Sequence, residues 1–171
     1  MAARTDLRKF QQSLIERLSA TGSQSTLNAK LGFEIAEEAW LIDLTGISEV
    51  LPVPYLEPVP LARKWLAGVA NVRGHLFTVV DMAAFLGKPI SEATVSSRLL
   101  LLNPRIARGV ALQVKTTYGL RHETQFQIDQ SYRSEREPWV KCGYRDNNGR
   151  YWREIDPQQL VAHPSFLDVS E

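Results

Sequence analysis

The chain has 171 residues, of which 44% are hydrophobic and 23% charged, as in one globular domain or two small ones sharing a core. Twenty basic residues against nineteen acidic ones give a formal charge of +1, which argues against a nucleic-acid-binding protein, because phosphate contacts require a basic excess. The single cysteine, Cys142, excludes an intramolecular disulfide and is typical of a reducing compartment. No apolar run approaches the roughly 20 residues of a membrane-spanning helix, and Asp6 and Glu16 interrupt any signal-like start. We therefore expect a cytoplasmic protein without direct membrane insertion.

The N-terminal segment, residues 5–18, predicts an amphipathic helix. Its apolar side chains recur at helical spacing: Leu7, Phe10, Leu14, Ile15 and Leu18. A Ser/Thr/Gly-rich linker follows at 19–26, so we divide the chain into a helix and linker (1–26) and a main domain (27–171). An isolated helix of this length is marginal in water. It must therefore dock onto the main domain or onto a partner, or else stay disordered, and we favour docking on a partner.

Beyond residue 31 the apolar period changes to two, which predicts β-structure. Phe33 and Ile35 alternate with polar residues, and a second apolar run at 40–44 completes a hairpin. Apolar runs at 99–102 and 109–114, separated by an Asn-Pro turn, predict another buried hairpin.

Two stretches lack this alternation. Four prolines between residues 52 and 60 favour an ordered crossover, although a polyproline ligand for another module is an alternative. Residues 125–136 are polar and unpatterned, which predicts a surface loop.

An imperfect repeat relates two segments that each begin with a tryptophan, at 65 and 139. Seven positions separate Gly74 from Asp81, and the same number separates Gly149 from Asp156. Each glycine suits a hairpin turn that requires a positive φ. Each aspartate suits the N-terminus of a short helix, whose free amides it can cap. The repeat predicts two similar small β-barrels, with short helices only near 82–86 and 157–162, although hairpins followed by caps also match by chance.

The sequence gives little support for a catalytic function. The three histidines are far apart, without metal-ligand spacing: His75, His122 and His163. Cys142 with His122 could form a nucleophile pair, but a lone cysteine beside a strand is more often an inert core thiol. Asp81 and Asp156 could be paired carboxylates, but their matching contexts favour capping. No phosphate-binding glycine loop is present in the sequence. We expect no enzyme, no metal and no cofactor.

Arg73 is not explained by folding alone. It occupies a tight turn after the nearly apolar strand 66–72. Arginine is enriched in interface hot spots because its planar fork makes several directed bonds. An arginine that simply solvates the turn is the other interpretation, and this feature alone favours neither.

The stretch 39–87 resembles the CheW-like domain family. The motifs that carry the resemblance are Trp-Leu-Ile-Asp-Leu at 40–44, Gly-Ile-Ser-Glu-Val-Leu-Pro at 46–52, Trp-Leu-Ala-Gly-Val-Ala-Asn-Val-Arg-Gly at 65–74, and Phe-Thr-Val-Val-Asp-Met at 77–82. The similarity continues more faintly to the helix after Asp156. Within the family, two segments are most similar to the sequences of adaptors from type IV pilus chemosensory systems: residues 68–74 and the ending His163-Pro-Ser-Phe-Leu-Asp.

The resemblance implies a mainly β fold with two SH3-like five-stranded barrels. It implies an adaptor that joins methyl-accepting chemotaxis receptors to a CheA-type histidine kinase, with receptor helices held in an apolar groove between the barrels. Ile47, Glu49, Gly68 and Arg73 fall on the positions associated with receptor contact. The sequence departs from the family at Gln113, where many members carry an aspartate, and at Arg63 and Lys64, which replace small or apolar residues. It also departs at Lys141 and Cys142, where smaller residues are usual.

Together these observations predict a non-enzymatic adaptor, recruited from the cytoplasm to membrane-anchored receptor arrays and controlling twitching motility. The alternative is a small β-barrel that binds single-stranded nucleic acid, as OB-like folds do. Salt dependence separates the two, because a nucleic-acid binder loses affinity steeply as salt rises.

Overall fold

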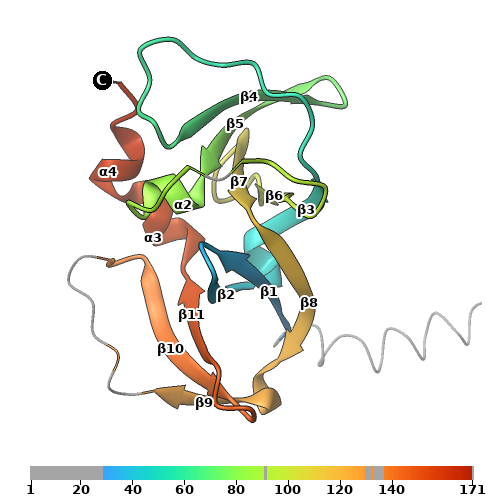
Figure 1. Ribbon diagram of the computed structural model, residues 1–171, viewed down its shortest axis with the longest axis vertical. Helices are drawn as coiled ribbons and strands as arrows, with labels where there is room; N and C mark the ends of the chain where they lie inside the picture. The colour runs from blue at the N-terminus through green and yellow to red at the C-terminus, as the bar shows by residue number, and fades with distance from the viewer. Residues whose placement is uncertain (1–28, 91, 130–131, 133–136, 171) are drawn as a thin grey trace, which may run out of the picture.

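The computed structural model describes residues 29–170 except 91, 130–131 and 133–136. The prediction of a mainly β fold is confirmed, and the strands form two sheets where two five-stranded barrels were expected (Figure 1). One sheet has five strands and the other has six. The helix and linker expected at 1–26 lie outside the described residues.

The six-stranded sheet draws on both ends of the described chain. Its order is β8-β1-β2-β11-β10-β9. Its strands are β1 (Ala29–Ile35), β2 (Glu38–Asp43), β8 (Thr116–His122), β9 (Phe126–Asp129), β10 (Val140–Asp146) and β11 (Tyr151–Ile155). Strand β9 lies in the segment 125–136, so the prediction of a loop there was wrong for 126–129, which pair with β10.

The five-stranded sheet comes from the middle of the chain, in the order β3-β6-β7-β5-β4. Its strands are β3 (Ile47–Pro52), β4 (Leu66–Val72), β5 (His75–Asp81), β6 (Arg98–Leu102) and β7 (Val110–Val114). The 3₁₀ turn η1 (Leu44–Gly46) carries the chain from β2 into this sheet.

Short helices follow the two repeated hairpins: α2 (Met82–Phe85) and α3 (Pro157–Ala162). The prediction of helices only at these two places was incomplete. The helix α4 (Pro164–Leu167) and the 3₁₀ turn η2 (Glu123–Gln125) are also present. Helix α4 forms because Pro164 is preset for a first helical turn, while His163 Nδ1 accepts from the amide of Ser165. No helix in the described part of the chain is long and apolar enough to cross a membrane.

Both sheets are curled, and their connectivity shows why. In each sheet, the two strands at opposite ends of the order are consecutive in the chain: β8 with β9, and β3 with β4. The turn η2 alone separates β8 from β9, so these two edges must lie close together. We call the two units the six-stranded and the five-stranded barrel.

The repeat extends to the pairing of the strands. The parallel pair β11–β2 corresponds to β5–β7, and the antiparallel pairs β10–β11, β1–β2 and β8–β1 correspond to β4–β5, β6–β7 and β3–β6. Bulges recur at equivalent places, after Val140 in β10 and after Leu66 in β4. Strand β9 has no full counterpart; the single bridge between Glu57 and Val69 stands in its place.

Apolar side chains form three clusters. The largest lies between the two sheets and takes residues from both, including Phe33, Trp40, Leu100, Leu112 and Ile155. A second fills the five-stranded barrel and a third fills the six-stranded barrel. Each sheet therefore has one face inside its own barrel and the other in the shared core.

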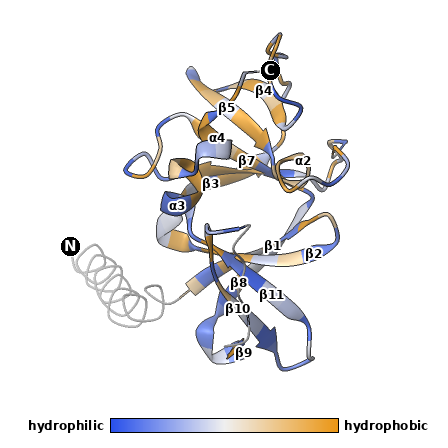
Figure 2. Ribbon diagram, turned by 90° about the vertical axis from the view of Figure 1, so that its left-hand side faces the viewer, coloured by the Kyte–Doolittle hydropathy of each residue, from blue (hydrophilic) through white to orange (hydrophobic). Residues whose placement is uncertain are grey.

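The strands of the two barrels differ in hydropathy: in Figure 2 those of the five-stranded barrel are mostly orange and those of the six-stranded barrel largely blue or white. Glu154 and Val79 each lie two residues before their capping aspartate, so they are equivalent. The strand register likewise makes Lys30 equivalent to Leu99. Lys30 and Glu154 form a buried ion pair, 2.8 Å between Nζ and Oε1, where the other barrel has leucine and valine.

This equivalence yields a stability prediction. Glu154→Val alone leaves Lys30 buried without its main partner and should lower the free energy of unfolding by about 3–5 kcal/mol. The combination K30L/E154V, with Tyr144→Phe added because Tyr144 donates to Glu154, copies the apolar barrel and should come within about 1.5 kcal/mol of the parent or exceed it. Urea denaturation measures both. A combined variant as unstable as the single one would contradict the equivalence.

Candidate functional site

The four residues expected at the receptor contact lie on the five-stranded barrel. Ile47 and Glu49 are on β3, Gly68 is on β4, and Arg73 is in the β4–β5 turn. The structure joins two of them directly: the Arg73 guanidinium donates to both carboxylate oxygens of Glu49, at 2.9 and 2.7 Å. Because β3 and β4 are the two end strands of this sheet, the pair spans the seam of the barrel.

Arg73 is held in a rigid turn yet is open to solvent. Arg73 and Gly74 form a two-residue hairpin turn with φ of 52° and 86°, and the Asn71 side chain accepts from the Gly74 amide at 2.9 Å. The Arg73 side chain is 76% exposed, whereas that of Glu49 is 32% exposed. The fork of the guanidinium is thus oriented by Glu49 while much of it is free for a further contact.

Gly68 has a structural role that its sequence context did not reveal. Its φ is 143°, and a Cβ built there would lie 2.5 Å from the carbonyl oxygen of Glu57. The backbone of Glu57 pairs with Val69 through two hydrogen bonds of 2.9 and 2.8 Å. Gly68 therefore allows the crossover from β3 to lie against β4. Ile47, partly buried, packs against the shared core.

The aspartates of the repeat act on the backbone. Asp81 Oδ1 accepts from the amides of Ala83 and Ala84, and Asp156 Oδ1 accepts from those of Gln158 and Gln159. Gly149 has a φ of 79°, in the loop that joins β10 to β11. These contacts fix helix starts and hairpin turns rather than a catalytic pair. Among the described residues, no three His, Cys, Asp or Glu side chains are grouped to hold a metal ion.

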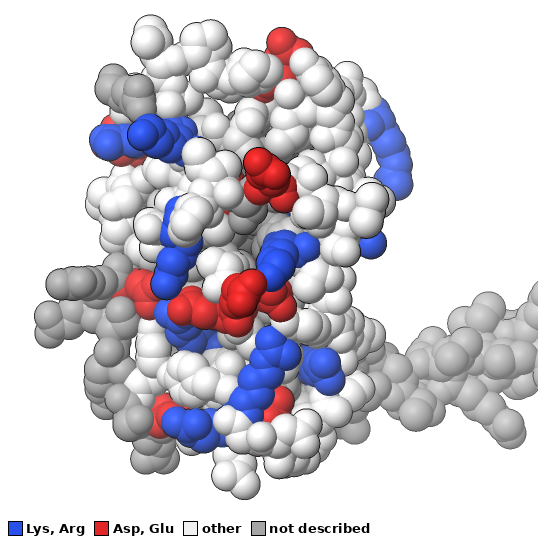
Figure 3. All heavy atoms as spheres, in the orientation of Figure 1, with Lys and Arg blue, Asp and Glu red and all other residues white. Residues whose placement is uncertain are grey.

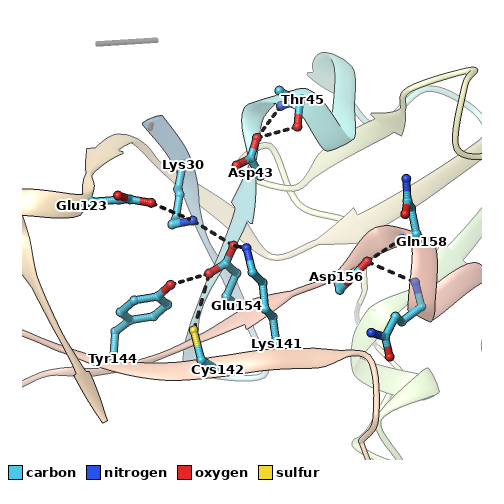
Figure 4. Close-up of polar contacts among 11 residues, drawn as sticks. Lys30, Asp43, Thr45, Glu123, Lys141, Cys142, Tyr144, Glu154, Asp156 and Gln158 are labelled. Carbon is cyan, nitrogen blue, oxygen red and sulfur yellow. Dashed lines mark hydrogen bonds and ion pairs between the residues drawn. The ribbon is translucent and has the colours of Figure 1, made fainter. Parts of the chain in front are cut away.

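A polar cluster inside the six-stranded barrel surrounds the Glu154 carboxylate (Figure 4). Besides the bond from Lys30, it accepts from Tyr144 Oη at 2.6 Å, from Lys141 Nζ at 3.4 Å and from Cys142 Sγ at 3.7 Å. Burial raises the pKa of the Cys142 thiol, which disfavours the thiolate that a nucleophile requires. The cysteine belongs to this cluster and not to a catalytic pair.

The cluster opens into a hollow of about 180 Å³ at the junction of the barrels. The β2–η1 segment contributes Asp43, Thr45 and Gly46, β11 and α3 contribute residues 154–158, and Ile106 comes from the β6–β7 loop of the other barrel. Ile47 directly follows Gly46 in the chain. The hollow therefore adjoins the start of β3, the strand that carries Ile47 and Glu49.

Sequence reasoning did not single out Lys30 or Glu154. The two residues are 124 positions apart and each resembles an ordinary surface charge in an alternating strand. The available signal was the repeat itself, since Glu154 stands where Val79 stands in the first copy. The departures noted at Lys141 and Cys142 belong to the same cluster.

The comparisons with known proteins agree with this architecture. The model of the CheW-like domain family matches residues 30–165. The chain belongs to the CheW-like domain family. Protein PilI of Pseudomonas aeruginosa is 27% identical over 146 residues, covering 82% of this chain and 79% of that protein. Chemotaxis protein CheW of Thermotoga maritima is 28% identical over 131 residues, covering 77% and 85%.

A solved structure shares the CheW-like fold. The scaffolding protein TtCheW of Thermoanaerobacter tengcongensis superposes with a TM-score of 0.67 at 17% identity, covering 81% of this chain and 94% of that one. The fold of this chain is therefore shared with that structure.

The acid dependence of stability follows from Glu154. Burial raises its pKa, but hydrogen bonds from Lys30 and Tyr144 and the charges of Lys30 and Lys141 outweigh burial and hold the pKa below its usual value. A depressed pKa contributes stability above the unfolded-state value of about 4.3, and that contribution is lost as the pH falls through the folded-state pKa. The stability difference between the parent protein and Glu154→Gln should thus be largest near neutral pH and shrink below about pH 4.3. Urea denaturation across this range tests it; a pH-independent difference would contradict it.

The variant Gly68→Ala tests whether Gly68 is required for the structure of the expected receptor site. The added methyl group meets the Glu57 carbonyl and the backbone is unfavourable for alanine, so we expect a loss of about 1–3 kcal/mol in unfolding free energy. Gly74→Ala is the matched control, because its φ is also positive but its Cβ meets nothing within 4 Å. Equal losses in the two variants would show that the close approach of Glu57 is unimportant.

Proposed function

We propose that this protein is a non-enzymatic chemosensory adaptor that couples methyl-accepting receptors to a CheA-type histidine kinase, in a system controlling type IV pilus twitching motility. Membership of the CheW-like family and the similarity to PilI support the class and the system. The observation that carries the receptor assignment is the exposed Arg73 side chain, whose guanidinium is held by Glu49 on a rigid turn at the seam of the five-stranded barrel.

The receptor's helical hairpin tip would bind helix-in-groove. Apolar side chains near Ile47 would supply the contact area, and Arg73 with Glu49 would set register and orientation at its margin. Each contact can be weak, because repeated linkage in an array adds avidity. The adaptor would act from the cytoplasm, recruited to membrane-anchored receptors.

The surface gives little support to the alternative of single-stranded nucleic acid. On the face that Figure 3 shows, acidic and basic side chains are interspersed around the waist and the lower half. The Phe126 ring packs against those of Tyr144 and Trp152 at the interior of the six-stranded barrel. A binder of single strands instead presents aromatic rings along a basic groove. Persistence of binding to the receptor fragment at high salt would favour the apolar groove.

Charge reversal at Arg73 tests the receptor site. Arg73→Glu should stay folded, because an exposed ion pair contributes about 0.2–1 kcal/mol, but should weaken binding of a receptor hairpin-tip fragment by about 2–5 kcal/mol, roughly 30-fold or more. Calorimetric titration measures the affinity. Arg63→Glu is the matched control. Like Arg73, Arg63 is an exposed arginine in an ion pair, in this case with Asp168.

The charge swap E49R/R73E distinguishes the two interpretations of Arg73. The swap restores an ion pair across the barrel seam, so it should recover stability and not receptor affinity. Full recovery of receptor affinity would show that the pair serves the fold alone and that Arg73 does not contact the receptor.

A further inference from the structure

A second, smaller hollow lies at the far end of the six-stranded barrel, away from the junction. Its volume is about 100 Å³. Its walls come from β8, η2, β9, β10, β11 and the loop that joins β10 to β11: Arg121, Gln125, Phe126, Asp146, Asn147, Asn148 and Trp152. Sites for cofactors and other small molecules span about 300–1,000 Å³, so this hollow suits one side chain of a partner.

Arg121 is the unusual member of this hollow. Its guanidinium carbon lies 5.5 Å from the centre of the Trp152 ring, and its Nε is buried without a hydrogen-bond partner. Within the described ranges, no carboxylate is near enough to form an ion pair with it. Leaving a partly buried donor unsatisfied costs free energy unless a ligand supplies an acceptor.

A second arginine reinforces the positive charge. The Arg150 guanidinium lies 5.1 Å from the same Trp152 ring and 4.5 Å from the ring of Tyr118, and it donates to Tyr118 Oη. The two cations share one aromatic platform.

The one carboxylate in the wall is already engaged. Asp146 Oδ1 accepts from the amides of Asn148 and Arg150, while Oδ2 accepts from the Trp152 indole at 2.9 Å. The hollow therefore presents one arginine, Arg121, that its own acidic residue does not pair.

The repeat provides an internal comparison. Arg121 pairs with Lys30 as Leu51 pairs with Leu99, so an arginine replaces an apolar residue of the other barrel. The position equivalent to Glu49, the carboxylate that serves Arg73, is Gly119. In the five-stranded barrel, Glu49 supplies the carboxylate that pairs with Arg73. In the six-stranded barrel, the equivalent residue is a glycine and cannot supply a carboxylate.

We propose that this hollow binds a carboxylate side chain of an acidic segment in a partner protein. The planar fork of Arg121, backed by Trp152, would receive the two carboxylate oxygens, with Arg150 adding charge at the rim. The site is separate from the expected receptor contact on the other barrel.

Titration with a small probe tests the proposal on the full chain. Acetyl-glutamate amide is added to ¹⁵N-labelled protein while the Trp152 indole and Arg121 Nε–H resonances are followed. We expect saturable shifts of both, at least tenfold weaker binding in Arg121→Gln, and no comparable shifts with acetyl-glutamine amide. Arg145→Gln is the matched control, because Arg145 also lies over an aromatic ring, that of Tyr151, but outside the hollow.

Three outcomes would overturn the proposal. Unchanged binding in Arg121→Gln would remove the arginine from the site, and equal binding of inorganic phosphate would show a general anion site. Tighter probe binding in D6N/E16Q, which removes the acidic residues before β1, would show that the chain's own N-terminal segment supplies the carboxylate. Arg121→Lys keeps the aliphatic stem and the charge but loses the fork; it should also bind more weakly, which keeps the test decisive if the glutamine variant does not fold.

Discussion

The burial of a face of each sheet against the other organises the whole molecule. Phe33 and Trp40 from one sheet and Leu100 and Leu112 from the other meet in a single core. A sheet whose opposite face already fills its own barrel has no water-facing side across its centre, so β6 is the continuous apolar run Leu99–Leu102 instead of an alternating one. This core also fixes the position of the junction hollow and of the start of β3. The turn η1, which carries the chain from β2 into the five-stranded barrel, passes beside the core and lines the hollow.

The two barrels share one pairing plan and have diverged in chemistry. The five-stranded barrel is apolar inside and polar at its hairpin tip, where Arg73 meets Glu49. The six-stranded barrel has the charged pair Lys30–Glu154 inside. A buried ion pair contributes little net stability compared with apolar residues of similar volume. The pair is therefore weak evidence for the stability of this barrel, and its Glu154 also lines the junction hollow.

The strands that carry alternating apolar residues could be predicted from the sequence, as could the tight turn at Arg73, because both are local. Strand β9 could not, since Phe126 and Ile128 stand among polar residues and the backbone pairing with β10 leaves no mark in the sequence. The family resemblance put Glu49 and Arg73 at one expected site, but their direct contact across the barrel seam was not predicted. The ion pair of Lys30 with Glu154 depends on the parallel pairing of β11 with β2, a long-range event that no window of residues records.

The order of the strands along the chain has a consequence for folding during translation. Strands β3 to β7 are contiguous and build the five-stranded barrel from one uninterrupted segment, whereas β2 must wait for β11, which is translated only after that whole segment. The first hairpin leaves the ribosome with Leu41 and Trp40 directed at partners that do not yet exist. Closing that long loop carries an entropic cost that the middle segment does not share, so the contiguous barrel is the natural first unit to fold and the template on which the discontinuous one assembles.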